Sequence, residues 1–136
     1  MRASKYLLDT SFVIALLFEK DHYHPEAKRI YEQLPDDAEF ITHRLVIGEA
    51  TSVACRRCKE RKLNCDFVLE KLAEFFGRIN ITSKDYSYEG IIEEMKQSKC
   101  TLSFVDTVLL KEAKRLNATL LTFDESLKKE FEKEIS

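Results

Sequence analysis

The sequence predicts an α/β fold in which a short central parallel sheet is flanked by helices on both faces. Short apolar segments alternate along the 136 residues with longer stretches whose apolar residues recur at helical spacing. Hydrophobic residues make up 44% and charged residues 34% of the chain, which has only three glycines and two prolines. This composition excludes disorder and fibrous repeats, and the length suits one compact domain over residues 1–136.

The first elements are a strand and two helices. Lys5–Leu8 is a short apolar strand that ends in a turn at residues 9–11, after which Phe12–Phe18 can continue as a buried helix. Pro25 suits the first turn of a second helix, because the N–H that proline lacks would be unpaired there. We expect this second helix to run to about Leu34.

The middle of the chain predicts two strands that alternate with two helices. Residues 35–37 break the chain before a strand at Glu39–Thr42, and a long helix follows until residues 64–66 interrupt it. The apolar stripe of this long helix is formed by Val46, Ala50, Val53 and Ala54. Apolar residues at positions 67–76 predict a further helix closed by Gly77, and Arg78–Thr82 is a third strand.

The last part predicts three helices and a fourth strand. Ser87–Lys99 is helical in character, and Ser103 followed by Asp106 is a capping box that opens a helix ending near residue 115. Thr119–Thr122 is the fourth strand, and the last helix spans Asp124–Glu134. Ligands of parallel α/β sheets bind beyond the carboxyl ends of the strands, where Asp9 and Asp124 fall.

Three acids occupy positions where a charge is costly. An exposed helical acid usually has a lysine or arginine three or four residues away, but Glu49 and Asp106 have only apolar or hydroxyl residues at these spacings. Asp9 directly follows an apolar strand. Carboxylates at the edge of a core must be neutralised, have their pKa raised, or bind a cation. Several together favour a hard divalent ion, and the Thr10 or Ser11 hydroxyl is placed to orient Asp9 or hold a metal-bound water.

Each acid also has an ordinary structural interpretation. Asp106 and Asp124 can cap helices, Asp9 can start a turn, and Glu49 can pair with a distant base. Asp124 has Lys128 four residues later, which also supplies a salt bridge. The combination of acids, rather than any one of them, favours a metal site.

The acidic segments together resemble the four signatures of PIN domains, in the order found in that family. They are Leu7-Leu8-Asp9-Thr10-Ser11, Gly48-Glu49-Ala50, Ser103-Phe104-Val105-Asp106-Thr107 and Leu121-Thr122-Phe123-Asp124. The resemblance implies a Rossmann-like parallel sheet and endoribonuclease activity with Mg²⁺ or Mn²⁺. It makes Asp9, Glu49, Asp106 and Asp124 the catalytic metal-site acids, with Thr10 or Ser11 in support.

The resemblance also bears on biological role and partners. PIN domains are frequently the VapC toxin of a toxin–antitoxin pair, which implies an RNA substrate, a small antitoxin protein and a second copy of the chain as partners. An RNA-maturation nuclease and a non-catalytic PIN-fold binding module are the alternatives. A net charge of -2 leaves only a local basic patch for phosphate binding. The apolar run Phe12–Phe18 is too short for a membrane helix, and we expect a cytoplasmic protein.

A cysteine motif in the middle of the chain suggests a zinc site. Cys55, Cys58 and Cys65 with their basic neighbours resemble half of a fungal zinc cluster, but only Cys100 follows where three further thiolates are needed. One zinc ion on all four cysteines is an alternative to two partly buried helical thiols at Cys55 and Cys58. Cytosolic thiols are normally reduced, and spacing assigns no disulfide.

The basic residues Arg56, Arg57 and Arg61 form either a solvated face or an RNA-backbone patch. His22 and His24 lie at the entrance of a polar helix, where surface or capping roles are expected. A haloacid-dehalogenase-type phosphotransferase is excluded, because it needs a second aspartate where Ser11 stands.

Overall fold

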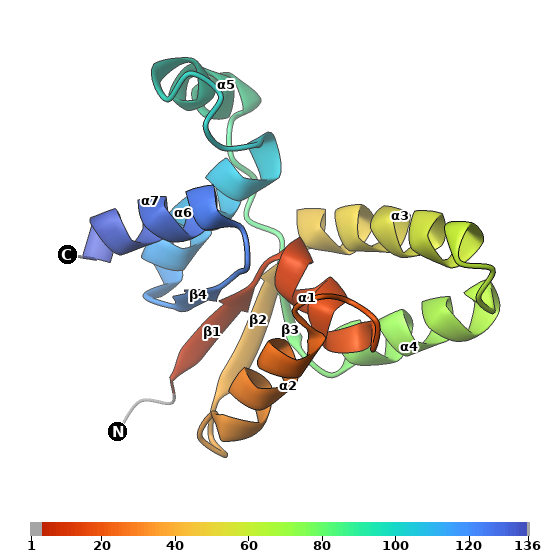
Figure 1. Cartoon of the computed structure of the whole chain (residues 1–136). Coiled ribbons are helices and arrows are strands. Elements are labelled where there is room, and N and C mark those ends of the chain that lie inside the picture. Colours follow the sequence, from red (N-terminus) through yellow and green to blue (C-terminus); the bar gives the residue numbers. More distant parts are fainter. Residues whose placement is uncertain (1–3, 136) are drawn as a thin grey trace.

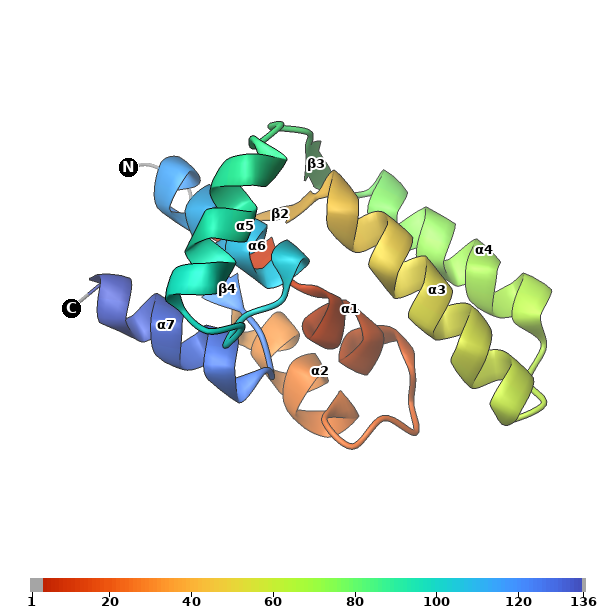
Figure 2. The same ribbon diagram turned by 90° about the horizontal axis from the view of Figure 1, so that it is seen from above.

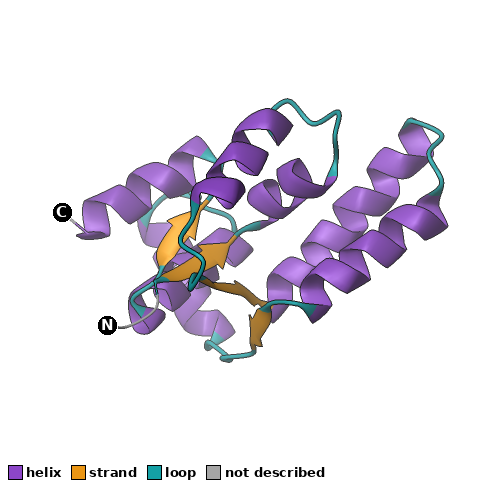
Figure 3. Ribbon diagram, turned by 90° about the horizontal axis from the view of Figure 1, so that it is seen from below, coloured by secondary structure: helices purple, strands orange, loops and turns teal. Residues whose placement is uncertain are grey.

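The computed structural model describes residues 4–135 and contains one sheet of four parallel strands. The strands are β1 (Lys5–Leu8), β2 (Glu39–His43), β3 (Asn80–Thr82) and β4 (Thr119–Leu121). Their order across the sheet is β3-β2-β1-β4, so β1 is central and pairs with β2 and β4. This confirms the predicted α/β class with its parallel sheet, and Figure 3 shows helices on both sides of the strands.

Seven helices surround this sheet within the described part of the chain. They are α1 (Thr10–Leu17), α2 (His24–Gln33), α3 (Arg44–Glu60), α4 (Cys65–Gly77), α5 (Tyr88–Gln97), α6 (Phe104–Leu116) and α7 (Glu125–Ile135). Helices α3 and α4 lie side by side as a projecting pair, whereas α5, α6 and α7 gather at the other end of the molecule (Figures 1 and 2). No helix among residues 4–135 is both long and apolar enough to cross a membrane.

The core lies between the sheet and the helices that cover it, and α1 packs against α3. Leu7 and Leu8 of β1 are fully buried, as is Val13 of α1. The small Ala50 and Ala54 are also fully buried on α3, which allows the α3 backbone to approach α1 closely. The predicted apolar stripe of α3 is therefore confirmed as its core-facing side, with Val53 partly exposed.

Helices α1 and α4 begin earlier than the sequence pattern predicted, at Thr10 and Cys65, and the side chain before each of α1, α3 and α4 supplies a cap. Asp9 accepts a hydrogen bond from the backbone N–H of Phe12 (2.8 Å), so α1 starts at Thr10 and there is no separate turn. His43 Nδ1 accepts from the backbone N–H of Leu45 (3.1 Å), so α3 follows β2 directly. Gly77 does end α4, but it lacks the positive φ expected of a capping glycine.

The cysteines depart from the expectation of four reduced thiols. A disulfide joins Cys58, in the last turns of α3, to Cys65, the first residue of α4, with their Cα atoms 5.6 Å apart. It closes the loop between the projecting helices. Cys55 and Cys100 are free and do not join this pair, so the single zinc site on four cysteines is wrong.

Parallel pairing places the ends of β1 and β4 beside each other. Leu8 is in register with Leu121, and the backbone N–H of Asp9 donates to the carbonyl of Leu121 (3.2 Å). The Thr42 hydroxyl of β2 donates to the carbonyl of Leu8 (2.6 Å), which fixes the other side of the same strand end. The segments that follow β1 and β4 therefore meet at one edge of the sheet.

Candidate functional site

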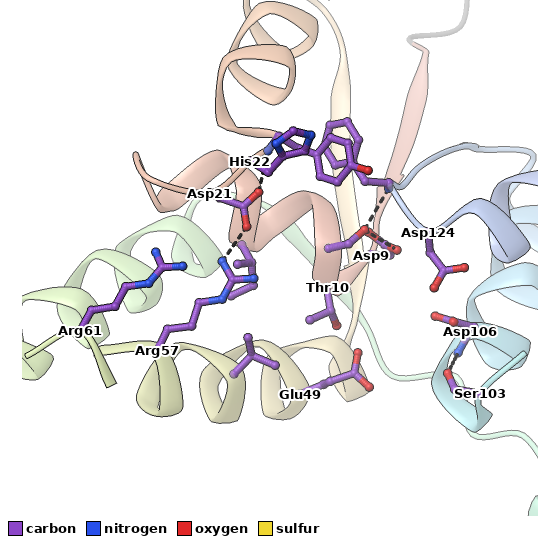
Figure 4. A pocket seen from close by; sticks show the side chains of 15 residues that line it. Asp9, Thr10, Asp21, His22, Glu49, Arg57, Arg61, Ser103, Asp106 and Asp124 are labelled. Atoms are coloured by element: carbon purple, nitrogen blue, oxygen red, sulfur yellow. Dashed lines mark hydrogen bonds and ion pairs between the residues drawn. The ribbon is translucent and has the colours of Figure 1, made fainter. Parts of the chain in front are cut away.

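A pocket of about 660 Å³ lies at this edge of the sheet. All four predicted acids line it, together with Thr10 and Ser11: Asp9 follows β1, Glu49 lies on α3, Asp106 on α6, and Asp124 precedes α7. Figure 4 shows Asp9, Asp106 and Asp124 on one side of the pocket, and Arg57 and Arg61 on the other. The fold thus brings together residues that are 115 positions apart in the sequence (9 to 124).

Asp9 is the most buried acid of the pocket, at 2% exposure. Its carboxylate caps α1 and accepts hydrogen bonds from the hydroxyls of Ser11 (2.8 Å) and Thr122. Burial raises the pKa of Asp9 from 3.8 to about 6, although these three hydrogen bonds oppose the rise and the nearby Asp124 charge adds to it. The residue is held rigidly in a place where its negative charge is costly.

Asp106 has a raised pKa for two reasons. It lies in the first turn of α6, where Ser103 caps the helix by accepting from the Asp106 backbone N–H (3.1 Å). The pKa of Asp106 is raised to about 6, chiefly by burial and then by the negative charges of Asp124, Asp9 and Glu49, while a hydrogen bond with the Ser103 side chain opposes the rise. Ser103 supplies its half of the predicted capping box, and the Asp106 carboxyl lies in the field of the other acids.

Salt bridges do not explain the four acids of the pocket, whereas helix capping explains part of the role of Asp124. Among residues 4–135, none of the four acids forms an ion pair with a lysine or arginine, and the Asp124–Lys128 salt bridge is absent. Asp124 does cap α7, because its carboxylate accepts from the backbone N–H of Leu127 (2.9 Å). Capping occupies one oxygen and leaves the negative charge uncompensated.

The residues of the pocket fit a hard divalent cation. The donors are carboxylates and a hydroxyl, which such ions prefer, and the buried Thr10 hydroxyl has no hydrogen-bond partner. In the part of the chain that is described, no three acidic, histidine or cysteine side chains converge closely enough to form a ready-made metal cluster. The pocket therefore supplies oxygen ligands of the kind that a divalent cation prefers, but its acidic side chains lie farther apart than three ligands that coordinate one ion directly.

The two predicted supporting hydroxyls have different roles. The Ser11 hydroxyl donates to the Asp9 carboxylate and accepts from the backbone N–H of Phe123 (2.9 Å). Ser11 therefore links Asp9 to the segment that follows β4. Thr10 has no such bond and remains available to a ligand in the pocket. Thr122, which also bonds Asp9 and accepts from the Asp124 backbone N–H (2.9 Å), was missed by sequence reasoning.

The three arginines predicted to bind RNA differ in their position relative to the pocket. Arg57 and Arg61 line the pocket, whereas Arg56 is exposed and does not. Arg57 is paired with Asp21 at 2.6 Å, and its guanidinium lies over the Phe18 ring, 5.7 Å from its centre. Sequence reasoning missed Asp21, because nothing in a local pattern shows that it contacts a helix 36 residues away.

Both histidines have the surface or capping positions that the sequence predicted. His24 is a capping-type residue, because its Nδ1 bonds the carbonyl of Ala15 at the end of α1 (2.8 Å). His22 is exposed, as expected, and it also lines the pocket beside Tyr23. In the sequence, His22 is marked only by its position between the end of α1 and the aromatic Tyr23. That His22 and Tyr23 lie near the acids follows from the tertiary structure alone.

Comparison with known proteins agrees with this geometry. The family model of the PIN domain matches residues 6–130. Among curated proteins, none matches the sequence significantly.

Several solved structures share the fold. VapC20 of Mycobacterium tuberculosis, a sarcin-ricin loop cleaving toxin, has a TM-score of 0.66 and 22% identity over 90% of this chain and 92% of that one. VapBC2 of Rickettsia felis, bound to a promoter DNA fragment, has a TM-score of 0.62 and 17% identity, with 92% of each chain covered. VapBC-1 of nontypeable Haemophilus influenzae has a TM-score of 0.62 and 19% identity, covering 92% of this chain and 90% of that one. Because the family match spans residues 6–130 and includes all four acids, the chain belongs to the PIN-domain family.

Proposed function

We propose that this protein is a divalent-metal-dependent endoribonuclease that hydrolyses RNA phosphodiester bonds. The observation that carries the proposal is a pocket in which four carboxylates lack an ion-paired lysine or arginine among the described residues, and in which burial is the main cause that raises the pKa of Asp9 and of Asp106 to about 6. Membership of the PIN-domain family supports the hydrolytic activity. Carboxylates that share a pocket and lack a protein cation are stabilised by binding a metal ion.

The proposed roles follow from the geometry of the site. Asp9, Glu49, Asp106 and Asp124 would hold Mg²⁺ or Mn²⁺, which supplies an activated water and neutralises charge on a phosphate. Ser11 and Thr122 fix the orientation of Asp9 through their hydroxyls. Thr10 presents a hydroxyl to a ligand, and Arg61 offers a cation for a neighbouring phosphate.

The first prediction is cleavage of single-stranded or loop RNA that depends on Mn²⁺ or Mg²⁺. Purified protein incubated with a structured RNA should produce discrete fragments with metal, and none when a chelator is in excess. The Asp106→Asn variant, purified in parallel, controls for contaminating nucleases. Equal cutting with chelator present would contradict the metal mechanism, and a complete lack of cutting would favour the non-catalytic binding module.

The second prediction concerns Arg56, Arg57 and Arg61, which we propose bind RNA through phosphates. Changing all three to glutamine should weaken binding to unrelated RNAs alike. The slope of log K against log salt should fall by about 0.7 for each phosphate of a single strand that the variant no longer neutralises. Filter binding or fluorescence anisotropy in chelator measures this slope. A matched variant neutralises Arg78, Lys96 and Lys129, which are exposed and do not line the pocket.

The structure also ranks the three arginines. Arg61 lines the pocket without an ion-pair partner among the described residues, so its single substitution should have the largest effect. Arg57 is partly engaged by Asp21, and Arg56 lies outside the pocket. An unchanged salt slope in the triple variant would assign this surface to solvent or to a protein partner.

We further propose the role of toxin in a VapBC-type pair, acting in the cytoplasm. This is supported by the likeness in fold to the VapC20 toxin and to VapBC complexes. An antitoxin protein and a second copy of the chain as partners remain predictions. A small reading frame adjacent to the gene, whose product binds this chain and blocks cleavage, would support the toxin role over RNA maturation.

A further inference from the structure

An aromatic ladder borders the acidic pocket on the side away from Asp106. Phe12 stacks on Phe123 with ring centres 5.6 Å apart, and Phe123 stacks on Tyr23 at 4.5 Å. His22 then meets the Tyr23 ring edge-on at 4.8 Å. Phe12, at the inner end of the ladder, is buried, whereas Tyr23 is 39% exposed. Both Tyr23 and His22 line the pocket.

We propose that His22 and Tyr23, the exposed end of this ladder, form a seat for one unpaired nucleobase of a bound RNA. The inference rests on the proposed ribonuclease function and specifies how that site recognises its substrate. Bases stack on exposed aromatic side chains because every base has a π face, and this contact needs no particular sequence. A base within a duplex cannot make it without leaving its own stack.

The loop that carries the two rings is fixed in place before any ligand arrives. The Asp21 carboxylate accepts from the Tyr23 backbone N–H with one oxygen (2.9 Å) and from Arg57 with the other (2.6 Å). The backbone N–H of His24 also donates to the carbonyl of Asp21 (3.0 Å). A stacking surface that is already ordered loses little conformational entropy when a base binds.

The same loop connects the rings to both kinds of charge in the pocket. Through Asp21 it orients Arg57, a cation suited to a phosphate, and through Phe123 it adjoins Asp124 and the Ser11 hydroxyl that holds Asp9. Figure 4 shows His22 and Asp21 between the arginine side and the acidic side of the pocket. A base seated here would belong to a nucleotide whose backbone continues toward the acids, so the seat would favour an unpaired nucleotide next to the cleaved bond.

The test uses the absence of tryptophan from the chain. Tyr23→Trp keeps an aromatic ring in the ladder and introduces the sole tryptophan, whose emission should fall when a base stacks on it. The full-length variant is titrated in chelator with a single-stranded oligoribonucleotide, with the same length of abasic ribose-phosphate, and with duplex RNA, while anisotropy of labelled nucleic acid reports binding. Tyr88→Trp is the matched control, because Tyr88 is exposed (64%) and does not line this pocket.

We expect the single strand to quench Tyr23→Trp, the abasic and duplex forms to quench it much less, and none to quench Tyr88→Trp. Tyr23→Leu and His22→Ala should each weaken single-strand binding roughly tenfold while leaving abasic binding unchanged. Equal quenching by the abasic strand, or a failure of single-stranded RNA to quench or to bind, would overturn the base seat. Mn²⁺-dependent cleavage by wild type without quenching would reject the base seat alone, whereas quenching without cleavage would reject the nuclease function alone.

Discussion

Replacing Asp106 by asparagine is expected to lower Mn²⁺-dependent RNA cleavage at least a hundredfold without weakening the fold. A metal ion that activates water and neutralises phosphate charge supplies several kcal/mol of transition-state stabilisation, and about 1.4 kcal/mol corresponds to a factor of ten in rate. Asparagine keeps the shape of the side chain but loses the negative charge that holds the ion. The measurement is kcat/KM on one defined RNA, with circular dichroism to confirm that the variant is folded.

A control of similar position is available on another helix. Asp66 lies in the first turn of α4 behind the cap Asn64, as Asp106 lies in the first turn of α6 behind the cap Ser103, but Asp66 is exposed and does not line the pocket. Asp66→Asn should therefore cleave RNA at the wild-type rate. If Asp106→Asn and Asp66→Asn behave alike, Asp106 is a helix-start residue and not part of the catalytic site.

Asp9 is a less clean position for the same experiment. Its carboxylate receives the Phe12 backbone N–H and the hydroxyls of Ser11 and Thr122, so Asp9→Asn changes a structural hydrogen-bond set as well as a charge. Removing a helix cap typically costs about 1 kcal/mol. Asp9→Asn therefore combines the loss of a charge with the loss of a helix cap.

The candidate acids could be found in the sequence because their local surroundings were unusual. Glu49 and Asp106 have no lysine or arginine at helical spacing, and Asp9 follows a strand whose last residues are buried. Such positions are unfavourable for a charge unless a ligand compensates it. Secondary structure followed from the same local patterns, and the errors were in element bounds, such as the earlier starts of α1 and α4 and the shorter strand β3.

The contacts that sequence reasoning missed all join segments far apart in the chain. Asp21 pairs with Arg57, Thr122 bonds Asp9, and Tyr23 stacks on Phe123. A local sequence pattern does not show which of these residues pair, because each pairing depends on how α1, α3 and the segment after β4 meet. The disulfide between Cys58 and Cys65 is a nearer pair, but its formation depends on the α3–α4 turn rather than on cysteine spacing.

The metal-free protein is expected to be more stable at pH 5 than at pH 7. In the folded state the pKa of Asp9 and of Asp106 is about 6, above the ordinary value of 3.8 that an unfolded chain has. Between these values the folded state binds more protons than the unfolded state, so stability falls as the pH rises from about 4 to 6 and remains reduced above it. For the buried Asp9, this shift corresponds to about 3 kcal/mol.

Another buried acid has the opposite effect but lies outside this pH window. Glu112 is fully buried and bonded to Arg115 and Tyr86, and these partners bring the pKa of Glu112 down to about 2 despite its burial. Its stabilising contribution is complete above its ordinary value of 4.5 and is lost only at lower pH. A comparison between pH 5 and pH 7 therefore leaves out the contribution of Glu112.

Thermal melting in chelator at the two pH values, repeated with Mn²⁺, measures the whole effect. Wild type should melt several degrees higher at pH 5 in chelator, and Asp106→Asn should melt no lower than wild type at pH 7, because one of the repelling charges is gone. Adding Mn²⁺ should raise the wild-type melting temperature most at pH 7, where the ligands are deprotonated, and should raise that of Asp106→Asn only weakly. Asp66→Asn should follow wild type throughout. An Asp106→Asn variant that is destabilised in chelator yet gains as much as wild type from Mn²⁺ would contradict the proposed site, because its carboxylate would then stabilise the fold without contributing to metal binding.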